Sequence, residues 1–159
     1  MFSATKYTGT KEEQYHLVAK QLEALINDEP NLTANLANAS ALLNQFLDNI
    51  NWVGFYLSDG RELVLGPFQG LPACIRIPFG KGVCGSAFAA RKTIRVADVN
   101  AFEGHIACDA NSRSEIVVPI IAGDEVKGVL DIDSPITDRF DDMDQKGLEL
   151  FVQTLSACF

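Results

Sequence analysis

Cys74, Cys84 and Cys108 lie in three separate segments that a compact fold would bring together. Cys74 falls in a short strand-like segment, Cys84 lies at the predicted start of a helix, and Cys108 lies in a polar loop. The positive end of a helix dipole and its unpaired N–H groups lower the pKa of a thiol, so the position of Cys84 favours a reactive thiolate. The alternative for each cysteine is burial as a small apolar side chain, and we accept that alternative for Cys158 near the C-terminus.

Cys108 has ionisable neighbours that bear on its reactivity. His105 precedes it by three residues and Arg113 follows it by five, and both could stabilise a thiolate, whereas the charge of Asp109 opposes one. A zinc site built from the three cysteines and His105 is the competing hypothesis. Structural zinc sites usually carry paired C-x2–4-C spacings, and only His105 and Cys108 are spaced in that way here. The sequence therefore favours no metal site.

A second group of candidate residues is acidic. In the segment VKGVLDID, apolar residues alternate onto one face of a predicted strand and leave Asp131 and Asp133 together on the other face. Glu115 begins the neighbouring predicted strand. Three carboxyl groups on adjacent strands raise one another's pKa values and would attract a cation, a ligand ammonium group or a shared proton. The alternative is that these side chains lie at strand ends and face water.

The hydrophobic pattern predicts the elements that hold these residues. Thr10 and Glu13 form a capping box ahead of an apolar stripe with helical spacing, and the pattern later changes to the period of a strand. The predicted helices are 10–26, 32–50, 82–91 and one that begins near Asp138, and the predicted strands are 52–57, 62–65, 74–77, 93–96, 115–121 and 125–133, with a polar loop over 98–114. Strands at hairpin spacing favour an α+β fold, in which helices flank a mostly antiparallel sheet of about six strands.

Length and charge limit the classes of function. The 159 residues suffice for one domain, and no linker or repeat divides them, so we take 1–159 as a single domain. A net charge of −8, from 13 basic and 21 acidic residues, makes nucleic acid and anionic membranes poor partners. No apolar run reaches the roughly 20 residues that span a bilayer, and the first segment has no apolar signal core. We therefore expect a soluble, cytoplasmic protein with reduced cysteines.

Several motifs narrow this interpretation. The segments IPFGKGVCGSAF and GVLDIDSPITDRFDDMD, together with the order of elements, resemble a GAF domain over nearly the whole chain. The combination of NWVGFYL, GKGVCG, HIACD followed by SEIVVPI, and GVLDIDS resembles the free methionine-(R)-sulfoxide reductases, which are stand-alone GAF proteins. The resemblance implies reduction of free L-methionine-(R)-sulfoxide, with thioredoxin as the reductant and no bound cofactor. The alternatives are a non-catalytic GAF small-molecule sensor and a thiol redox sensor.

The resemblance also implies roles for the cysteines. A thiolate attacks the sulfoxide sulfur and becomes a sulfenic acid, a second cysteine condenses with it to a disulfide, and a dithiol reductant reopens that disulfide. We expect Cys108 to attack, because a mobile polar loop can present its thiolate to the substrate and then to a partner. Cys84 and Cys74 are then the resolving candidates, and attack by Cys84 with resolution by Cys108 remains open. Cys158 lies outside the family pattern.

The other candidates receive binding roles from the same resemblance. Glu115, Asp131 and Asp133 are expected to hold the substrate ammonium group and to polarise the sulfoxide. Trp52 and Tyr56 are expected to wall the methylsulfinyl group, the alternative being ordinary core packing. Heptad-like spacing of apolar residues over 32–50, together with the likeness to GAF domains, favours a homodimer.

Overall fold

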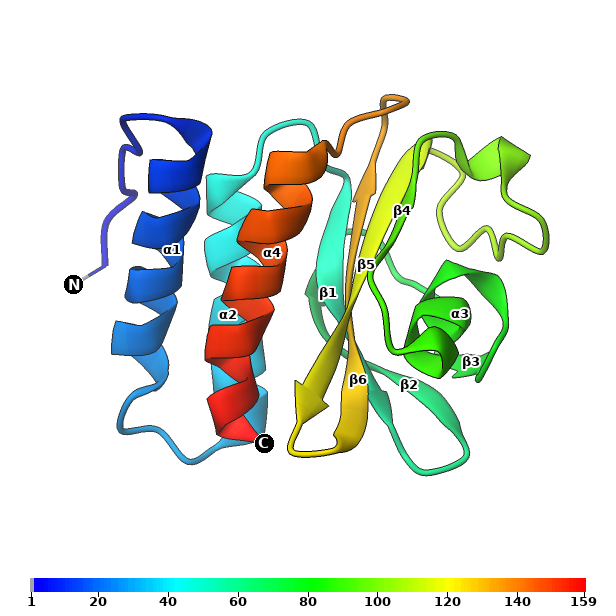
Figure 1. The fold of residues 1–159 in the computed structure, drawn as a ribbon, viewed down its shortest axis with the longest axis horizontal. Helices are drawn as coiled ribbons and strands as arrows, with labels where there is room; N and C mark the ends of the chain where they lie inside the picture. The colour runs from blue at the N-terminus through cyan, green and yellow to red at the C-terminus, as the bar shows by residue number, and fades with distance from the viewer. Residues whose placement is uncertain (1) are drawn as a thin grey trace.

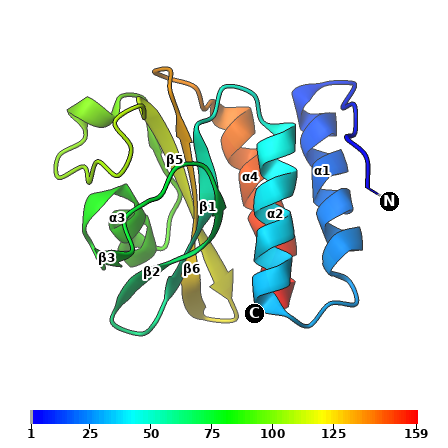
Figure 2. The same ribbon diagram turned by 180° about the vertical axis from the view of Figure 1, so that it is seen from behind.

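A single antiparallel sheet with helices on both faces organises the computed structural model, which describes residues 2–159 (Figure 1). In chain order the elements are α1 (Lys11–Ile26), α2 (Leu32–Phe46), β1 (Trp52–Ser58), β2 (Glu62–Gln69), β3 (Arg76–Pro78), α3 (Gly82–Ala90), β4 (Ile94–Val96), β5 (Ser114–Ala122), β6 (Glu125–Ser134) and α4 (Asp142–Leu155). Helices α2 and α4 cover one face of the sheet and α1 packs outside them, whereas α3 and the loop between β4 and β5 cover the other face (Figures 1 and 2). The predicted α+β class is confirmed.

Side-chain caps decide where two of the long helices begin. The hydroxyl of Thr10 accepts from the backbone N–H of Glu13, and the Glu13 carboxylate accepts from the backbone N–H of Thr10, so the predicted capping box is confirmed. Asp141 caps α4 in the same manner, and the helix therefore begins at Asp142. The prediction of a start near Asp138 was wrong, because that residue has a left-handed φ of 53°.

Helix α2 is shorter than its hydrophobic spacing predicted. The helix ends at Phe46, since Leu47 has an extended backbone with φ −91° and ψ 128°. Asn49 then turns the chain with a φ of 55°. Ile50 continues the apolar spacing because it packs against the same core from the connection to β1 and not from the helix.

The order of strands brings the acidic segments together. The sheet runs β3-β2-β1-β6-β5-β4, and every pair of neighbouring strands is antiparallel. Gly54 of β1 lies opposite Asp131 of β6, and Glu115 of β5 lies opposite Asp133 of β6. Side chains from these three strands that point to one face are therefore close neighbours.

Two hydrophobic clusters pack against opposite faces of this sheet. Leu130 and Ile132 belong to the cluster under α1, α2 and α4, whereas Val129 belongs to the cluster under α3. The predicted alternation is confirmed over 129–132, where Asp131 shares its face with Val129, whereas a register shift at 126–128 interrupts it nearer the start of β6. No helix within residues 2–159 is long and apolar enough to cross a membrane.

The position of Cys74 differs from the prediction. Strand β3 begins at Arg76, and Cys74 lies in the irregular segment before it. The ladder between β2 and β3 covers three residue pairs, and only one further backbone bond, from the N–H of Leu65 to the carbonyl of Ile75, continues it. The strand predicted over 74–77 is therefore shifted toward the C-terminus, and this shift leaves Cys74 beside the loop that carries Cys108.

Candidate active site

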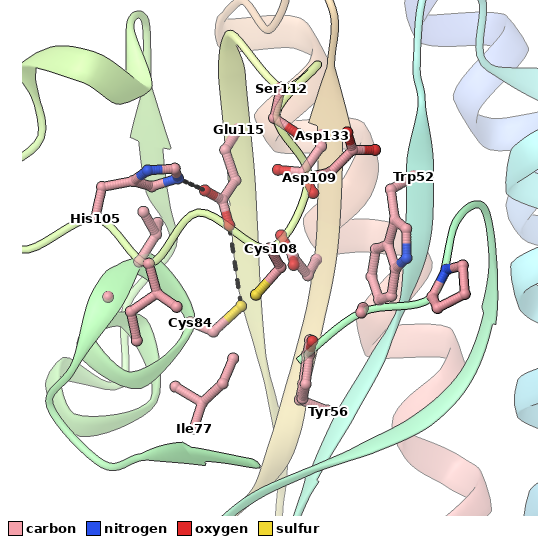
Figure 3. A pocket seen from close by; sticks show the side chains of 16 residues that line it. Trp52, Tyr56, Ile77, Cys84, His105, Cys108, Asp109, Ser112, Glu115 and Asp133 are labelled. Atoms are coloured by element: carbon pink, nitrogen blue, oxygen red, sulfur yellow. Dashed lines mark hydrogen bonds and ion pairs between the residues drawn. The ribbon is translucent and has the colours of Figure 1, made fainter. Parts of the chain in front are cut away.

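A small pocket lies between α3, the loop after β4 and the sheet face opposite the long helices (Figure 3). It contains seven of the eight residues singled out from the sequence: Trp52, Tyr56, Cys84, Cys108, Glu115, Asp131 and Asp133. The eighth, Cys74, is tied to the pocket through its bond to Cys108. In this disulfide-bonded state the free space inside is about 30 Å³, which is enough for water.

A disulfide joins Cys74 to Cys108, and their Cα atoms are 5.6 Å apart. Both residues are half-buried, whereas Cys84 is buried and carries a free thiol. Of the resolving candidates left open by the sequence, Cys74 is therefore the one bonded to Cys108. The zinc hypothesis with three cysteine ligands and His105 is wrong for this state, because two of those sulfur atoms are bonded to each other.

The expected low pKa of Cys84 is also wrong. Cys84 does lie in the first turn of α3, but its side chain is 4% exposed and faces the acidic cluster. Burial raises the pKa of the Cys84 thiol well above its ordinary value, and the charges of Asp131 and Glu115 raise it further. Desolvation and like charge therefore outweigh the helix dipole at this position.

The carboxyl groups form the floor of the pocket, and two of them, Glu115 and Asp131, do not face water as the alternative held, whereas Asp133 is half-buried. Glu115 is 5% exposed and Asp131 is 6% exposed. Burial, with a further contribution from the charge of Asp133, raises the pKa of Glu115 to about 8. Burial and the neighbouring Glu115 raise the pKa of Asp131, and burial and Asp131 raise that of Asp133. Among residues 2–159, Oδ1 of Asp131 has no hydrogen-bond partner.

The two predicted aromatic residues form one wall of the pocket. The rings of Trp52 and Tyr56 stack with centroids 5.9 Å apart, and Phe68 stacks on Trp52 from β2 at 5.1 Å. The Tyr56 hydroxyl donates to the backbone carbonyl of Cys74 at 2.8 Å, and Nε1 of Trp52 donates to the carbonyl of Leu71 at 3.1 Å. The wall therefore also anchors the irregular segment that carries Cys74.

His105 and Asn51 contribute contacts that the sequence did not reveal. Nε2 of His105 lies 3.6 Å from Oε2 of Glu115, so the histidine meets the carboxyl cluster, whereas the sequence placed it as a partner of Cys108 (Figure 3). The amide of Asn51 donates to Asp109 and to Ser112, which holds the loop against β1. No spacing rule marks an isolated asparagine of this kind. Arg113, also considered as a thiolate partner, is exposed and does not line the pocket.

Comparison with known proteins shows to which protein family this chain belongs. A sequence profile of the GAF domain matches residues 32–159. The Escherichia coli (strain K12) protein named free methionine-R-sulfoxide reductase is 51% identical over 145 residues, which cover 91% of this chain and 88% of that protein. The chain belongs to this family of GAF-domain reductases.

Two further proteins are similar over nearly their whole length. A Bacillus subtilis (strain 168) protein, YtsP, is 59% identical over 157 residues, covering 98% of this GAF domain and 96% of that protein. The free methionine-R-sulfoxide reductase of Neisseria meningitidis, solved in complex with its substrate, is 45% identical with a TM-score of 0.94. That alignment covers 100% of this chain and 96% of the solved chain.

Proposed function

We propose that this GAF domain reduces free methionine-(R)-sulfoxide to methionine. The observation that carries the proposal is the Cys74–Cys108 disulfide beside a pocket whose floor is made of buried carboxyl groups. A redox-active cysteine pair supplies the two electrons that a sulfoxide needs, and carboxyl groups supply protons and bind an ammonium group. The family relationship to the Escherichia coli and Neisseria meningitidis reductases supports the same substrate.

Cys108 is the proposed nucleophile. In the reduced protein its thiolate attacks the sulfoxide sulfur, the oxygen is transferred to Cys108 as a sulfenic acid, and methionine leaves. The Cys74 thiol then attacks the sulfenic sulfur, forming the disulfide and releasing water. One dithiol is oxidised in the last step to return both cysteines to thiols, which balances the reduction of one sulfoxide.

The carboxyl groups have separate roles in proton donation and in binding of the substrate ammonium group. Glu115, whose pKa of about 8 keeps it largely protonated at neutral pH, donates the proton that the departing sulfoxide oxygen requires. The unpartnered Oδ1 of Asp131 accepts a hydrogen bond from the substrate ammonium group, and Asp133 adds to the negative potential there. Trp52 and Tyr56 hold the methylsulfinyl group against the wall, and the fixed wall and floor select one epimer at sulfur.

Thioredoxin is the proposed reductant, since its dithiol performs the exchange that the disulfide requires. The proposal includes a homodimer in the cytoplasm. The support for the dimer is the likeness to GAF domains, since the heptad-spaced residues, among them Leu36, Leu43 and Ile50, pack in the core of this same chain. The support for the cytoplasm is the need for a reducing dithiol pool.

The test couples the protein to thioredoxin, thioredoxin reductase and NADPH and offers the R and S epimers of free methionine sulfoxide separately. We expect NADPH oxidation with the R epimer, none with the S epimer and none with a sulfoxide inside a peptide. Cys158→Ser is the matched control and should retain the activity, because Cys158 lies outside the pocket. Absence of turnover with both epimers, in folded and reduced protein, would contradict the proposal and favour a ligand sensor.

A further inference from the structure

The proposed mechanism uses Cys108 and Cys74 and assigns no role to the buried thiol of Cys84. Sγ of Cys84, one carboxyl oxygen of Glu115 and one of Asp131 all lie within 4.8 Å of one another. Sγ of Cys84 is 4.0 Å from Oε1 of Glu115 (Figure 3). The three residues come from α3, β5 and β6, so the sheet register and the docking of α3 fix their separation.

This cluster is acidic, buried and without a basic partner of fixed charge. Each of the three side chains is more than nine-tenths buried, and Oδ1 of Asp131 has no hydrogen-bond partner among the described residues. Within residues 2–159, no lysine or arginine forms an ion pair with these carboxyl groups, and His105 is the sole base in ion-pair distance of Glu115. Buried acidic groups are normally paired or coordinate a metal, so the cluster favours a cation.

We propose that Cys84, Glu115 and Asp131 bind a thiophilic divalent cation of the Zn²⁺ class. One sulfur and two oxygen donors suit Zn²⁺ or Cd²⁺, whereas Mg²⁺ and Ca²⁺ prefer oxygen ligands alone. A water molecule or His105 completes four-coordination. On binding, the sulfur–metal bond replaces the S–H bond of Cys84, the protons of this thiol and of the coordinating carboxyl groups pass to the buffer, and no electron is transferred. The space of about 30 Å³ is enough for an ion with a water molecule.

This donor set differs from the zinc hypothesis that the sequence raised. That hypothesis needed cysteine pairs close in the sequence, and it fails because Cys74 and Cys108 are bonded to each other. The present set uses one cysteine and two carboxyl groups that only the tertiary fold brings together. The Cys74–Cys108 disulfide leaves all three of these donors free, so the site exists in the oxidised protein.

The test is a titration of the oxidised protein with Cd²⁺. Binding is measured by the ultraviolet absorption of the Cd²⁺–thiolate bond. The protein carries Cys158→Ser, because Cys158 is the other free thiol. We expect about one Cd²⁺ per chain, loss of the absorption on adding Cys84→Ser, and at least about tenfold weaker binding on adding Asp131→Asn. Glu125→Gln, which changes an exposed carboxylate of the same strand, is the control and should bind as the parent does.

Three results would overturn the site: no thiolate absorption in the parent, absorption that survives Cys84→Ser, or equal binding by Asp131→Asn and Glu125→Gln. Cys84→Ala provides a second removal of the sulfur, and a thermal melt of each variant establishes that it is folded. Because this readout needs no turnover, it is independent of the proposed reductase activity.

A second expectation rests on the proposed function. The cation and the substrate ammonium group should exclude each other from the pocket, because both bind Asp131. A variant with Cys74, Cys108 and Cys158 all changed to Ser keeps Cys84 but forms no disulfide and performs no turnover. Methionine-(R)-sulfoxide should raise its apparent Kd for Cd²⁺, and the S epimer, which chelates free Cd²⁺ equally, should not. Equal Kd values for Cd²⁺ with both epimers would overturn the mutual exclusion. The metal site itself is tested separately by the first titration, which contains no substrate.

Discussion

The hydroxyl of Tyr56 donates a hydrogen bond of 2.8 Å to the backbone carbonyl of Cys74. Tyr56 is a buried residue of the central strand β1, whereas Cys74 lies in an irregular segment. The bond therefore connects the rigid sheet to one half of the disulfide. In the proposed mechanism, a pocket wall that also positions Cys74, the proposed resolving cysteine, links substrate binding to the second chemical step.

Replacing Tyr56 by Phe should separate these two tasks. The ring and its stacking on Trp52 remain, but the bond to Cys74 is lost, which corresponds to about 1 kcal/mol or roughly a fivefold slower formation of the disulfide. Release of the first methionine should stay within about twofold of the parent. Rapid-quench measurement of methionine and of free thiols resolves the steps. Tyr15→Phe is the control, because it removes a buried hydroxyl bond to Asp144 far from the pocket; equal slowing in both variants would contradict the account.

Glu115, the proposed proton donor, should give the reaction an alkaline limit. Since the pKa of free-enzyme Glu115 is raised to about 8, its carboxyl group holds the proton below that pH and loses it above, so kcat/KM for the sulfoxide should fall as pH rises through about 8. In Glu115→Gln, kcat/KM should fall at least about a hundredfold and this limb should disappear. An unchanged limb in Glu115→Gln would assign the titration to another group.

The same carboxyl group should make stability depend on pH. The folded pKa of Glu115 is about 8 and its ordinary value is 4.5, so the native protein holds a proton that the unfolded chain releases between these values. The free energy of unfolding should therefore fall as pH rises from 4.5 to about 8, and Asp131 and Asp133 act in the same direction. Denaturant titrations of Glu115→Gln should show a decline shallower by at most about 1.4 kcal/mol per pH unit. Parallel curves for the two proteins would rule this out.

The absence of a side chain at Gly82 should be necessary for the loop that carries Cys108 to pack in its observed position. Its φ is +61°, and an added Cβ would come within 3.0 Å of Ile106 in that loop. Gly82→Ala should therefore cost about 1–3 kcal/mol of stability and lower kcat/KM. Gly60→Ala is the matched control, because Gly60 has a φ of +89° with open space around it and should show the backbone cost alone. Ile106→Ala should remove the excess cost of Gly82→Ala over Gly60→Ala; an excess that survives would contradict this contact.

The features that could be predicted from the sequence are those set by local periodicity and caps. Alternation along 125–133 placed Leu130 and Asp131 on opposite faces, because successive strand side chains must alternate. Thr10 and Glu13 marked the start of α1, because their side chains complete backbone groups within one turn. Hairpin spacing also predicted the antiparallel pairing of β1 with β2 and of β5 with β6.

What could not be predicted depends on how distant segments pack. From the sequence, the helix dipole predicted a lowered pKa for Cys84. Docking of α3 against β5 and β6 instead buries the thiol among carboxyl groups, which raises its pKa. The choice of Cys74 as the partner of Cys108 depends on the path of two irregular segments. The contact of His105 with Glu115 likewise joins a loop to a strand, and no spacing rule connects them.

The most direct test of the mechanism is single-turnover release of methionine by reduced Cys74→Ser and Cys108→Ser proteins, given methionine-(R)-sulfoxide without an external reductant. The account predicts that Cys74→Ser releases about one methionine per chain and leaves a sulfenic acid on Cys108, identified by mass spectrometry of the trapped peptide. It predicts that Cys108→Ser releases none. Release of one methionine per chain by Cys108→Ser would contradict the account and would make Cys84 the attacking residue.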